Sequence, residues 1–340
     1  MSNIASKYKL AIIMPVLNEE SFIGQTLEQI YSQDFPMAEV EVVIADGGSS
    51  DKTKEIASLF KNRFGSLILL DNPKKFSSAG RNLGVKNSSA PYILILDGHI
   101  NLPDKHLLSS IINVFEKTDA KCLCNTQFLN PPDLIEFEKS IAVCSGSILG
   151  HRTRSKLFSN DESKIDPVSS CAIYRRDVFE IVGYFDERFD ACADIDFNYR
   201  VNKAGLKSIT SPQLKISYYP KSSLNGLWRQ MQRYGGGYFN FSTKHNYYFL
   251  PQLIAGVGVL GFLFLFLLSM LHTPAFGFLK SVVGIYLLVI ILFSGMLTVK
   301  EKHIGCLIFG LLIFSTIHFG LGVGFWKQFY KKYFNINVNK

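Results

Sequence analysis

The sequence predicts an α/β domain with a mostly parallel sheet, followed by an apolar region long enough to cross a membrane more than once. Up to about Tyr248, short apolar segments alternate with helical segments, which is typical of strands joined by crossover helices. The strongest strand signal is the apolar run 91–96, which stops at Asp97-Gly98-His99 and indicates a strand buried on both faces. From Phe249 to Phe325 the chain is overwhelmingly apolar.

Predicted strands and helices alternate through the first hundred residues of the chain. The predicted strands are 9–16, 40–45, 67–70 and 91–96. The first helix opens at residues 18–21 and places Ile23, Leu27 and Ile30 on one face. The next helices are 52–60, with Asp51 as a candidate N-cap, and 79–86. These intervals indicate right-handed crossovers in a three-layer domain.

Two of the predicted strands end in a carboxylate, at Asp46 and at Asp97. An Asp-Gly pair is also a common turn, so either strand end alone could be an ordinary turn. Because the carboxyl ends of parallel strands meet at one edge of the sheet, two such ends favour a ligand site there. A carboxylate and an imidazole separated by Gly98 could hold a divalent cation that carries a phosphate group. In this half of the chain no Gly-x-Gly-x-x-Gly motif opens a helix and no Walker-type loop occurs, so dinucleotide and ATP sites lack their usual motifs.

The middle of the chain is less regular. Residues 165–176 predict a loop of small residues that leads into a strand, and a helix that starts at Arg176-Asp177 ends at Gly183. Asp194 and Asp196 then lie at the start of another helix. One interpretation is structural, because acidic side chains stabilise a helix N-terminus on electrostatic grounds alone. The other is functional, with one of these carboxylates acting as a general base beside a nucleotide site. The residue pattern does not separate these two interpretations.

Three stretches of the apolar region are long enough to cross a bilayer. They are Phe249–Leu271, Phe276–Leu297 and His303–Phe325. The preceding segment, Ser222–Tyr248, has apolar residues at helical spacing with Arg229 and Arg233 between them. This pattern predicts either a helix at the membrane interface or an ordinary docking helix, broken in both cases at Gly235-Gly236-Gly237.

The predicted location follows from charge and from the first apolar run. The formal net charge of +8 fits attraction to anionic headgroups, and no recognised nucleic-acid motif accompanies it. The run Leu10–Leu17 is short and contains Pro15, so we expect no secretory signal and a cytoplasmic first half, anchored in the cell membrane.

Three crossings would leave the tail 327–340 and its four lysines outside, against the positive-inside tendency. Either the glycine-rich last segment re-enters the membrane or the tendency fails here.

Seven short motifs follow one another along the chain up to Tyr234. They are Met14-Pro15-Val16-Leu17-Asn18-Glu19-Glu20, Asp46-Gly47-Gly48-Ser49-Ser50-Asp51-Lys52-Thr53, Ala79-Gly80-Arg81-Asn82-Leu83-Gly84, Asp97-Gly98-His99, Gly183-Tyr184-Phe185-Asp186-Glu187, Asp194-Ile195-Asp196 and Gln230-Met231-Gln232-Arg233-Tyr234. In this order they resemble the family 2 inverting glycosyltransferases of the GT-A fold. Within that family the chain is similar to the membrane-anchored enzymes of exopolysaccharide assembly, of the succinoglycan type.

The resemblance implies a role for each matching residue near a nucleotide diphosphate sugar. Pro15 and Glu19 lie where the family begins its nucleotide pocket. Asp46 matches the acid that contacts the base or the ribose, and Arg81 matches a basic position near the nucleotide.

The metal signature departs from the family pattern in one position. Asp97 and His99 match the Asp-x-Asp signature that binds a divalent cation, Mn²⁺ or Mg²⁺, on the donor diphosphate, but the second ligand is an imidazole. Imidazole suits Mn²⁺ better than Mg²⁺. The succinoglycan-type subgroup, which the chain resembles, uses Asp-x-His.

On the acceptor side the resemblance implies one catalytic base. Asp194 matches the second acid of the family's Glu-Asp pair, which deprotonates the acceptor hydroxyl, and Asp196 is a further expected substrate contact. Ala193 stands where the Glu of that pair is expected, so Asp194 lacks its usual neighbour. A single-displacement inverting reaction needs only one such carboxylate.

Gln230, Arg233 and Tyr234 resemble the Gln-x-x-Arg-Trp signature near the acceptor and the leaving diphosphate. Tyr234 replaces the Trp of the processive synthases, which favours the addition of one sugar over polymerisation. We therefore expect transfer of a single sugar to a membrane-held, lipid-linked glycan acceptor. The alternatives are a processive polysaccharide synthase and a non-catalytic membrane subunit that binds nucleotide.

The predicted organisation has four parts. They are a cytoplasmic GT-A catalytic domain over 1–221, an interfacial amphipathic segment over 222–248, a transmembrane region over 249–326 and a basic tail over 327–340. The expected partners are the nucleotide sugar donor, the membrane glycan acceptor and membrane lipids.

Overall fold

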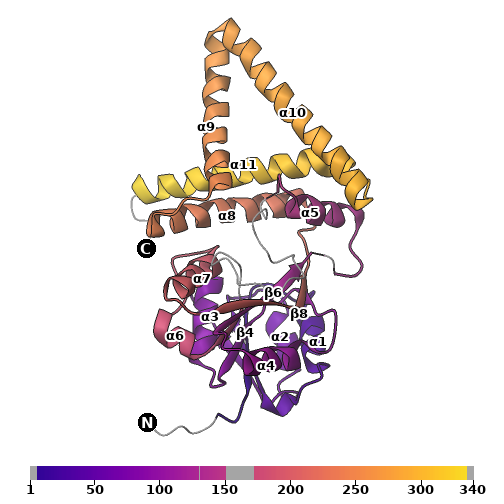
Figure 1. Cartoon of the computed structure of the whole chain (residues 1–340), viewed down its shortest axis with the longest axis vertical. Helices are drawn as coiled ribbons and strands as arrows, with labels where there is room; N and C mark the ends of the chain where they lie inside the picture. Colours follow the sequence, from indigo (N-terminus) through magenta and orange to yellow (C-terminus); the bar gives the residue numbers. More distant parts are fainter. Residues whose placement is uncertain (1–5, 130, 151–171, 335–340) are drawn as a thin grey trace. The chain divides into compact units, whose positions relative to one another are not determined.

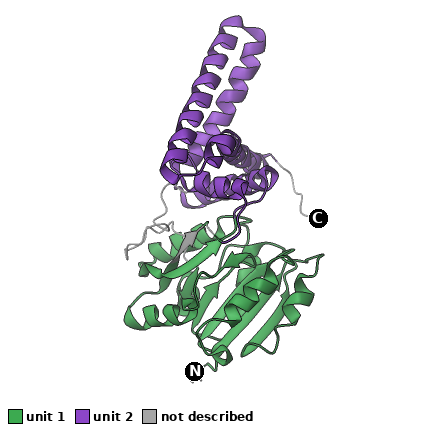
Figure 2. Ribbon diagram, turned by 90° about the vertical axis from the view of Figure 1, so that its right-hand side faces the viewer, with its two compact units in different colours: residues 1–131, 155–219 green, residues 132–154, 220–340 purple. Residues whose placement is uncertain are grey.

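The computed structural model describes residues 6–129, 131–150 and 172–334. The chain divides into two compact units, shown in separate colours in Figure 2. Unit 1 comprises residues 1–131 and 155–219, and unit 2 comprises residues 132–154 and 220–340. Unit 2 therefore takes in a segment from the middle of the first half as well as the C-terminal region.

Unit 1 is built on a mixed sheet that contains eight strands within the described residues, in the order β3-β2-β1-β4-β7-β6-β8-β5. The strands are β1 (Leu10–Val16), β2 (Val40–Asp46), β3 (Ser66–Asp71), β4 (Tyr92–Ile95), β5 (Ile100–Asn101), β6 (Cys122–Phe128), β7 (Ile173–Arg175) and β8 (Ser208–Tyr218). The neighbours β3, β2, β1 and β4 pair in parallel, as predicted. The second half is mixed: β6 and β8 pair in parallel, whereas β7 pairs antiparallel with β4 and β6, and β5 pairs antiparallel with β8.

The helices of unit 1 follow the predicted alternation. They are α1 (Ile23–Tyr31), α2 (Thr53–Ser58), α3 (Ser77–Lys86), α4 (Leu107–Lys117), α6 (Asp177–Val182) and α7 (Ala193–Lys203), with a 3₁₀ turn η1 at Met37–Glu39. Ile23, Leu27 and Ile30 of α1 are fully buried, which confirms the predicted face. Helix α2 is shorter than the predicted 52–60, because the amides of Leu59 and Phe60 bond to the carbonyls three residues back and close turns.

Helix α3 packs closely on the first two strands because two of its residues lack side chains. A Cβ added at Gly84 would lie 2.2 Å from Ile13 Cγ2 in β1. A Cβ added at Gly80 would lie 3.1 Å from Pro15 Cβ and 3.3 Å from Ala45 Cβ. The glycines of the segment 79–84 therefore set the distance between this helix and the sheet edge.

Unit 2 consists of helices throughout its described residues. They are α5 (Glu136–Gly146), α8 (Leu224–His245), α9 (Leu250–Leu271), α10 (Thr273–Glu301) and α11 (Gly305–Tyr333). Helices α9, α10 and α11 are the three in the described residues that are long and apolar enough to cross a membrane. Figure 1 shows α8 and α11 side by side, with the α9–α10 hairpin extending away from them, and Figure 2 shows the same hairpin from the side.

The predicted break of α8 at its three glycines is wrong. The helix continues from Leu224 to His245 without interruption. The glycines are needed for packing instead, because a Cβ added at Gly235 would lie 2.1 Å from the carbonyl oxygen of Leu321 in α11. Close backbone contact between two helices compensates for the low helix propensity of glycine.

Candidate active site

The candidate site lies at the carboxyl edge of the parallel strands. Asp46 is the last residue of β2 and is paired in register with Val16 at the end of β1. Asp97 follows β4, which lies on the other side of β1. Asp46 and Asp97, which the sequence predicts at one edge of the sheet, therefore lie at the ends of β2 and β4, the two strands on either side of β1.

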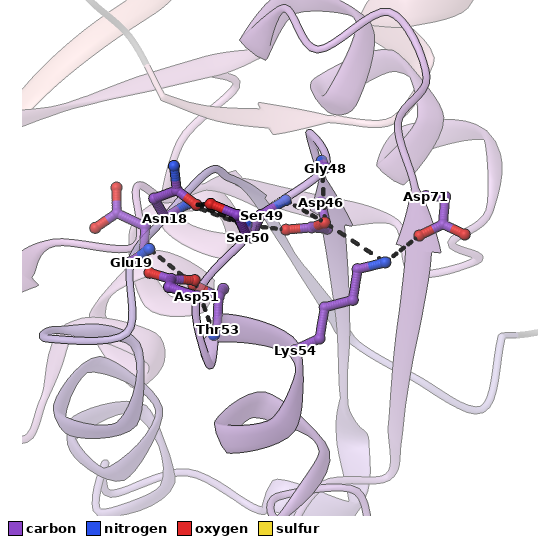
Figure 3. Close-up of polar contacts among 10 residues, drawn as sticks. All are labelled: Asn18, Glu19, Asp46, Gly48, Ser49, Ser50, Asp51, Thr53, Lys54 and Asp71. Atoms are coloured by element: carbon purple, nitrogen blue, oxygen red, sulfur yellow. Dashed lines mark hydrogen bonds and ion pairs between the residues drawn. The ribbon is translucent and has the colours of Figure 1, made fainter.

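The Asp46 carboxylate is buried and is satisfied by its own loop. It is 1% exposed, and its Oδ2 accepts hydrogen bonds from the amides of Gly48 and Ser49, each at 3.0 Å. The Ser49 hydroxyl donates to Oδ1, and Lys54 Nζ lies 3.6 Å from Oδ2 (Figure 3). Gly48 has a φ of +89°, which explains why glycine stands in this turn. In the described structure Asp46 thus shapes the loop, and its predicted contact with the base or ribose stays a prediction.

A second loop is tied to the first by reciprocal hydrogen bonds. The Asn18 amide donates to Ser49 Oγ at 2.8 Å, and the Ser50 amide donates to Asn18 Oδ1 at 2.9 Å. The Glu19 amide donates to Thr53 Oγ1 at 2.8 Å (Figure 3). We call the two loops 17–20 and 46–53 the rim. Its backbone is held by side chains from both loops, which makes it a rigid border.

Asp51 and Lys54 complete the rim. Burial acts to raise the pKa of the Asp51 carboxyl, but hydrogen bonds from Thr53 Oγ1 and from the amides of Glu20 and Thr53 outweigh it and lower the pKa. Lys54 bonds to Asp71 at 2.5 Å, and this hydrogen bond raises the pKa of the lysine. The lowered pKa favours the ionised form of Asp51, and Lys54 is paired with Asp71 at the edge of the rim.

The segment Asp97-Gly98-His99 lies against Glu19. A Cβ added at Gly98 would lie 2.9 Å from Glu19 Cγ, so glycine is required there. The Gly98 carbonyl accepts a hydrogen bond from the buried Thr26 hydroxyl at 2.7 Å. His99 Nδ1 donates to Glu19 Oε1 at 2.7 Å. In this arrangement the carboxylate orients the ring, and Nε2 is the nitrogen that would ligate a metal.

Asp97 differs from Asp46 in having no partner among the residues that the structure describes. It is half-buried, and its carboxylate makes no hydrogen bond or ion pair with any residue that the structure describes. No three His, Cys, Asp or Glu side chains converge as metal ligands within the described ranges. Asp97 and His99 fit a cation as a two-ligand protein site that needs further oxygen ligands from a diphosphate.

Helix α3 holds the motif that follows α6. Asn82 Nδ2 donates to the Phe185 carbonyl and to Glu187 Oε1, each at 2.9 Å, and Asn82 Oδ1 accepts from the Phe185 amide at 2.9 Å. Arg81 lies beside these contacts, with its guanidinium carbon 5.4 Å from the Phe185 ring centroid. Its Nε is buried and has no hydrogen-bond partner among the described residues. A buried donor of this kind would be satisfied by an anionic ligand.

Helix α7 presents one acidic residue and buries the other. Asp196 is fully buried and accepts from Arg200 Nε at 3.1 Å. Asp194, in the same first turn, is half-buried and has no hydrogen bond or ion pair with a residue in the described parts of the chain. Asp194 is thus placed as an available carboxylate, whereas Asp196 is engaged in packing α7, and the role of each in substrate binding stays a prediction.

Tyr174 in β7 is a contact that the sequence did not indicate. Its hydroxyl donates to Asn198 Oδ1 of α7 at 2.9 Å. Burial raises the pKa of Tyr174 well above its usual range, and the charges of Arg81 and Asp194 act on it in opposite directions. Arg81 and Asp194 therefore lie within electrostatic reach of the same buried hydroxyl. An aromatic residue in a three-residue strand gave no sequence signal for this role.

The last predicted site residues belong to unit 2. Gln230, Arg233 and Tyr234 lie in α8, where Gln230 Nε2 donates to Tyr234 Oη at 3.2 Å. Arg233 is exposed. Their predicted role at the acceptor and the leaving diphosphate stays a prediction.

Comparisons with known proteins agree along the whole chain. The family model described as "Glycosyl transferase family 2" matches residues 11–183, and the one described as "Glycosyl transferase family group 2" matches residues 163–327. The chain is 30% identical over 236 residues to the succinoglycan biosynthesis protein ExoA of Rhizobium meliloti (strain 1021), covering 69% of this chain and 70% of that protein.

Two further comparisons extend this agreement. The chain is 26% identical over 275 residues to a dolichyl N-acetyl-alpha-D-glucosaminyl phosphate 3-beta-D-2,3-diacetamido-2,3-dideoxy-beta-D-glucuronosyltransferase of Methanococcus voltae, covering 75% of this chain and 84% of that protein. Among solved structures, the mannosyltransferase PcManGT of Pyrobaculum calidifontis, determined with GDP-Man and Mn²⁺, superposes with a TM-score of 0.60 over 96% of this chain and 89% of that one. Its 16% sequence identity makes this a likeness of fold.

Proposed function

The chain belongs to glycosyl transferase family 2, and on that basis we propose that it transfers one sugar, with inversion, from a nucleotide diphosphate sugar to a lipid-linked glycan in the membrane. It is a glycosyltransferase with a GT-A fold and three apolar helices able to span a membrane. The proposal places the reaction in surface or exopolysaccharide synthesis. The relative from Methanococcus voltae, whose name specifies a dolichyl-linked acceptor, supports the choice of a lipid-linked acceptor.

The observation that carries the proposal is the contrast between a satisfied and an available carboxylate at one sheet edge. Asp46 is enclosed by its own loop, whereas Asp97 is half-buried without a partner in the described parts of the chain, next to a histidine that Glu19 orients. A carboxylate that has no hydrogen bond with the described residues does little to stabilise the fold. Together with an oriented imidazole it makes a suitable pair of metal ligands. Asp97 and His99 would hold a divalent cation, which would neutralise the charge that develops on the leaving diphosphate.

Arg81 would support the same anion from the side of α3. Its buried Nε lacks a partner among the described residues, so a phosphate oxygen would satisfy it. Stacking on Phe185 holds the guanidinium in place. The hydrogen bonds of Asn82 to the Phe185 backbone fix that ring in turn.

Asp194 would act as the base. It lies in the first turn of α7, where it is half-buried and has no hydrogen bond within the described residues. A carboxylate there could take the proton of the acceptor hydroxyl as the hydroxyl oxygen attacks the anomeric carbon and the diphosphate leaves. Arg200, which pairs with Asp196, donates to the carbonyls of Val182 and Tyr184, and with the Tyr174–Asn198 hydrogen bond these contacts hold α7, from which Asp194 projects.

The proposal of single transfer rests on the acceptor-side signature. Gln230, Arg233 and Tyr234 are proposed to contact the acceptor and the leaving diphosphate, with Tyr234 in place of the Trp of processive synthases. Product length separates this proposal from a processive synthase, because a ladder of long polymer would contradict single transfer. A nucleotide-binding subunit without catalysis would release no nucleotide diphosphate with any donor or acceptor.

The test uses membranes that contain the full chain, a panel of labelled nucleotide sugars and a metal chelator. We expect one donor to be used and transfer to stop in the chelator, with recovery on adding Mn²⁺. The variant Asp97→Asn should need at least about tenfold more Mn²⁺ for half-maximal transfer. The matched control is Asp119→Asn, which removes an exposed carboxylate paired only with Lys207 and should behave as the unmodified protein. Full transfer in the chelator would overturn the metal role.

A further inference from the structure

The three apolar helices of unit 2 differ in what surrounds them. In the most apolar 18-residue window of each helix, 6% of the residues are buried in α9 and 17% in α10, but 44% in α11. Helix α11 lies along α8, whereas the α9–α10 hairpin extends away from both (Figures 1 and 2). The hairpin thus presents far more of its surface to its surroundings than α11 does, as helices that cross a lipid bilayer do.

Helices α8 and α11 touch over much of their length. A Cβ added at Gly324 of α11 would lie 2.1 Å from the carbonyl oxygen of Gln232 in α8. Further along, the Phe239 ring of α8 packs against Phe325 and Phe329 of α11, with ring centroids 5.1 and 5.9 Å apart. The two helices therefore run together in the same direction and must share one orientation relative to the membrane.

Helix α8 is too polar to cross a bilayer. It carries Arg229, Arg233, Lys244 and His245, and its amphipathic pattern suits a helix that lies at the interface. If α11 crossed the membrane, the turns of α8 bound along it would enter the hydrocarbon with their arginines, which is costly. The observed pairing therefore favours an orientation in which both helices lie along the membrane plane.

The contacts of α11 with the α9–α10 hairpin determine how deep α11 lies in the membrane. Trp326 Nε1 donates to the Gly256 carbonyl at 2.7 Å, and a Cβ added at Gly322 would lie 2.4 Å from the Ala255 carbonyl oxygen. Both partners belong to the first third of α9. Phe319 of α11 also reaches the rings of Phe262 in α9 and Tyr286 in α10. Helix α11 thus lies next to α8 and across the part of the hairpin where α9 begins, with side chains that reach the middle of the hairpin.

Charge and length agree with two crossings. Near the hairpin apex the only lysine or arginine is Lys280, in the first eight residues of α10, whereas Lys300 and Lys302 lie at the other end of α10 and Lys331 and Lys332 at the end of α11. At 22 and 29 residues, α9 and α10 are about 33 and 44 Å long, enough to cross a bilayer, the longer one with a tilt.

We propose that α9 and α10 are the crossing helices and that α11 lies along the membrane plane, in the leaflet on the side where α8 lies. The basic end of α11, with Lys327, Lys331 and Lys332, then meets the lipid headgroups on that side. This arrangement brings the basic end of α11 to the side where α9 begins and satisfies the positive-inside tendency that three crossings would violate. It does not depend on the proposed reaction.

The first test locates three points of the full chain in sealed right-side-out and inverted membrane vesicles. Epitope tags at the N- and C-termini should be reached by protease from the same side. His272→Cys should react with a membrane-impermeant maleimide from the opposite side, and the unmodified protein measures the background from the six native cysteines. Tags on opposite sides, or His272→Cys reactive from the tag side, would overturn the proposal.

The second test measures depth with matched nitroxide labels. Leu263→Cys lies near the middle of α9 and Leu312→Cys lies in α11, and the parent side chains are 49% and 51% exposed. In reconstituted vesicles the label at 263 should be far more accessible to oxygen than to a water-soluble nickel quencher, and the label at 312 should show a severalfold lower ratio. Equal ratios would mean that α11 reaches the bilayer centre and would overturn the in-plane placement, even with both tags on one side.

Discussion

The rim and the β4 edge of unit 1 both carry acidic residues, but they satisfy them in opposite ways. In the rim, loops 17–20 and 46–53, Asp46 accepts two backbone amides and a hydroxyl, and Asp51 accepts amides from both loops. At the β4 edge and the start of α7, Asp97 and Asp194 have no hydrogen bond or ion pair with any described residue. The carboxylates of the first region hold the shape of their loops, whereas those of the second are the ones we propose as ligand and base.

Glu19 joins the two regions. Its amide is bound by Thr53 in the rim, and its carboxylate accepts from His99 at the β4 edge. The resemblance placed Glu19 in the nucleotide pocket and His99 at the metal, which are separate roles. The geometry indicates that a change at Glu19 should be felt by the metal ligand as well.

The largest effect is expected from the available carboxylate of α7. Asp194→Asn should lower sugar transfer about 10²- to 10⁴-fold, because an amide cannot take the acceptor proton. Donor binding should remain, since the proposed donor ligands lie on other elements. Transfer rates in membranes and binding of the labelled donor measure the two separately, with Asp119→Asn as the control. Transfer above half of the unmodified level would exclude Asp194 as the base.

The next effect tests whether Glu19 acts through His99. Glu19→Gln should raise the Mn²⁺ concentration for half-maximal transfer about 10- to 100-fold, because it weakens the orientation of the ring. At saturating Mn²⁺ the donor KM should be nearly unchanged. A raised KM that persists at saturating Mn²⁺ would show instead that Glu19 contacts the nucleotide, as the resemblance implies.

The strands near the site could be predicted because their signals are local. Continuous apolar runs mark β1, β2 and β4, and the parallel pairing of β3, β2, β1 and β4 places their carboxyl ends at one edge. Strands β5 and β7 are too short to show a periodic pattern, and their antiparallel pairing depends on distant segments. The mixed character of the sheet therefore could not be read from the sequence.

Long-range contacts account for the other differences. Glu19 and His99 are 80 residues apart, and no local pattern marks their hydrogen bond. Three consecutive glycines normally end a helix, but α8 continues because Gly235 allows the backbone of α11 to approach. In both cases the sequence identified the residue, and the tertiary contact determined what it does.

A smaller effect should follow from a change inside the rim. Asp46→Asn leaves amide hydrogens facing the donors of Gly48 and Ser49, so it should lower the free energy of unfolding by about 1–3 kcal/mol. Thermal unfolding of the solubilised full chain measures it. The control is Asp71→Asn, which also removes a partner of Lys54 but from an 83% exposed side chain, and it should cost less than about 0.5 kcal/mol. Equal losses would mean that burial of Asp46 is not what matters.

The smallest effect concerns Glu187, which accepts hydrogen bonds from Asn82 and from Lys74. These hydrogen bonds, with that of Asn82 the larger, lower the pKa of Glu187 below its usual 4.5. A lowered folded-state pKa means that its stabilisation is present above pH 4.5 and is lost as the pH falls through the folded value. Glu187→Gln should therefore cost about 1 kcal/mol at pH 7, and the difference from the unmodified protein should shrink below pH 4.5.

The matched control for that change is Glu28→Gln. Glu28 makes an ion pair of the same length with Arg63, but at a more exposed position, so its replacement should change the melting temperature little at either pH. Melting of both variants at pH 7 and pH 4 separates a specific hydrogen-bonded carboxylate from general surface charge. If Glu187→Gln and Glu28→Gln respond alike, the segment 183–190 is not held to α3 by this carboxylate, and packing of Phe185 with the Asn82 contacts must suffice.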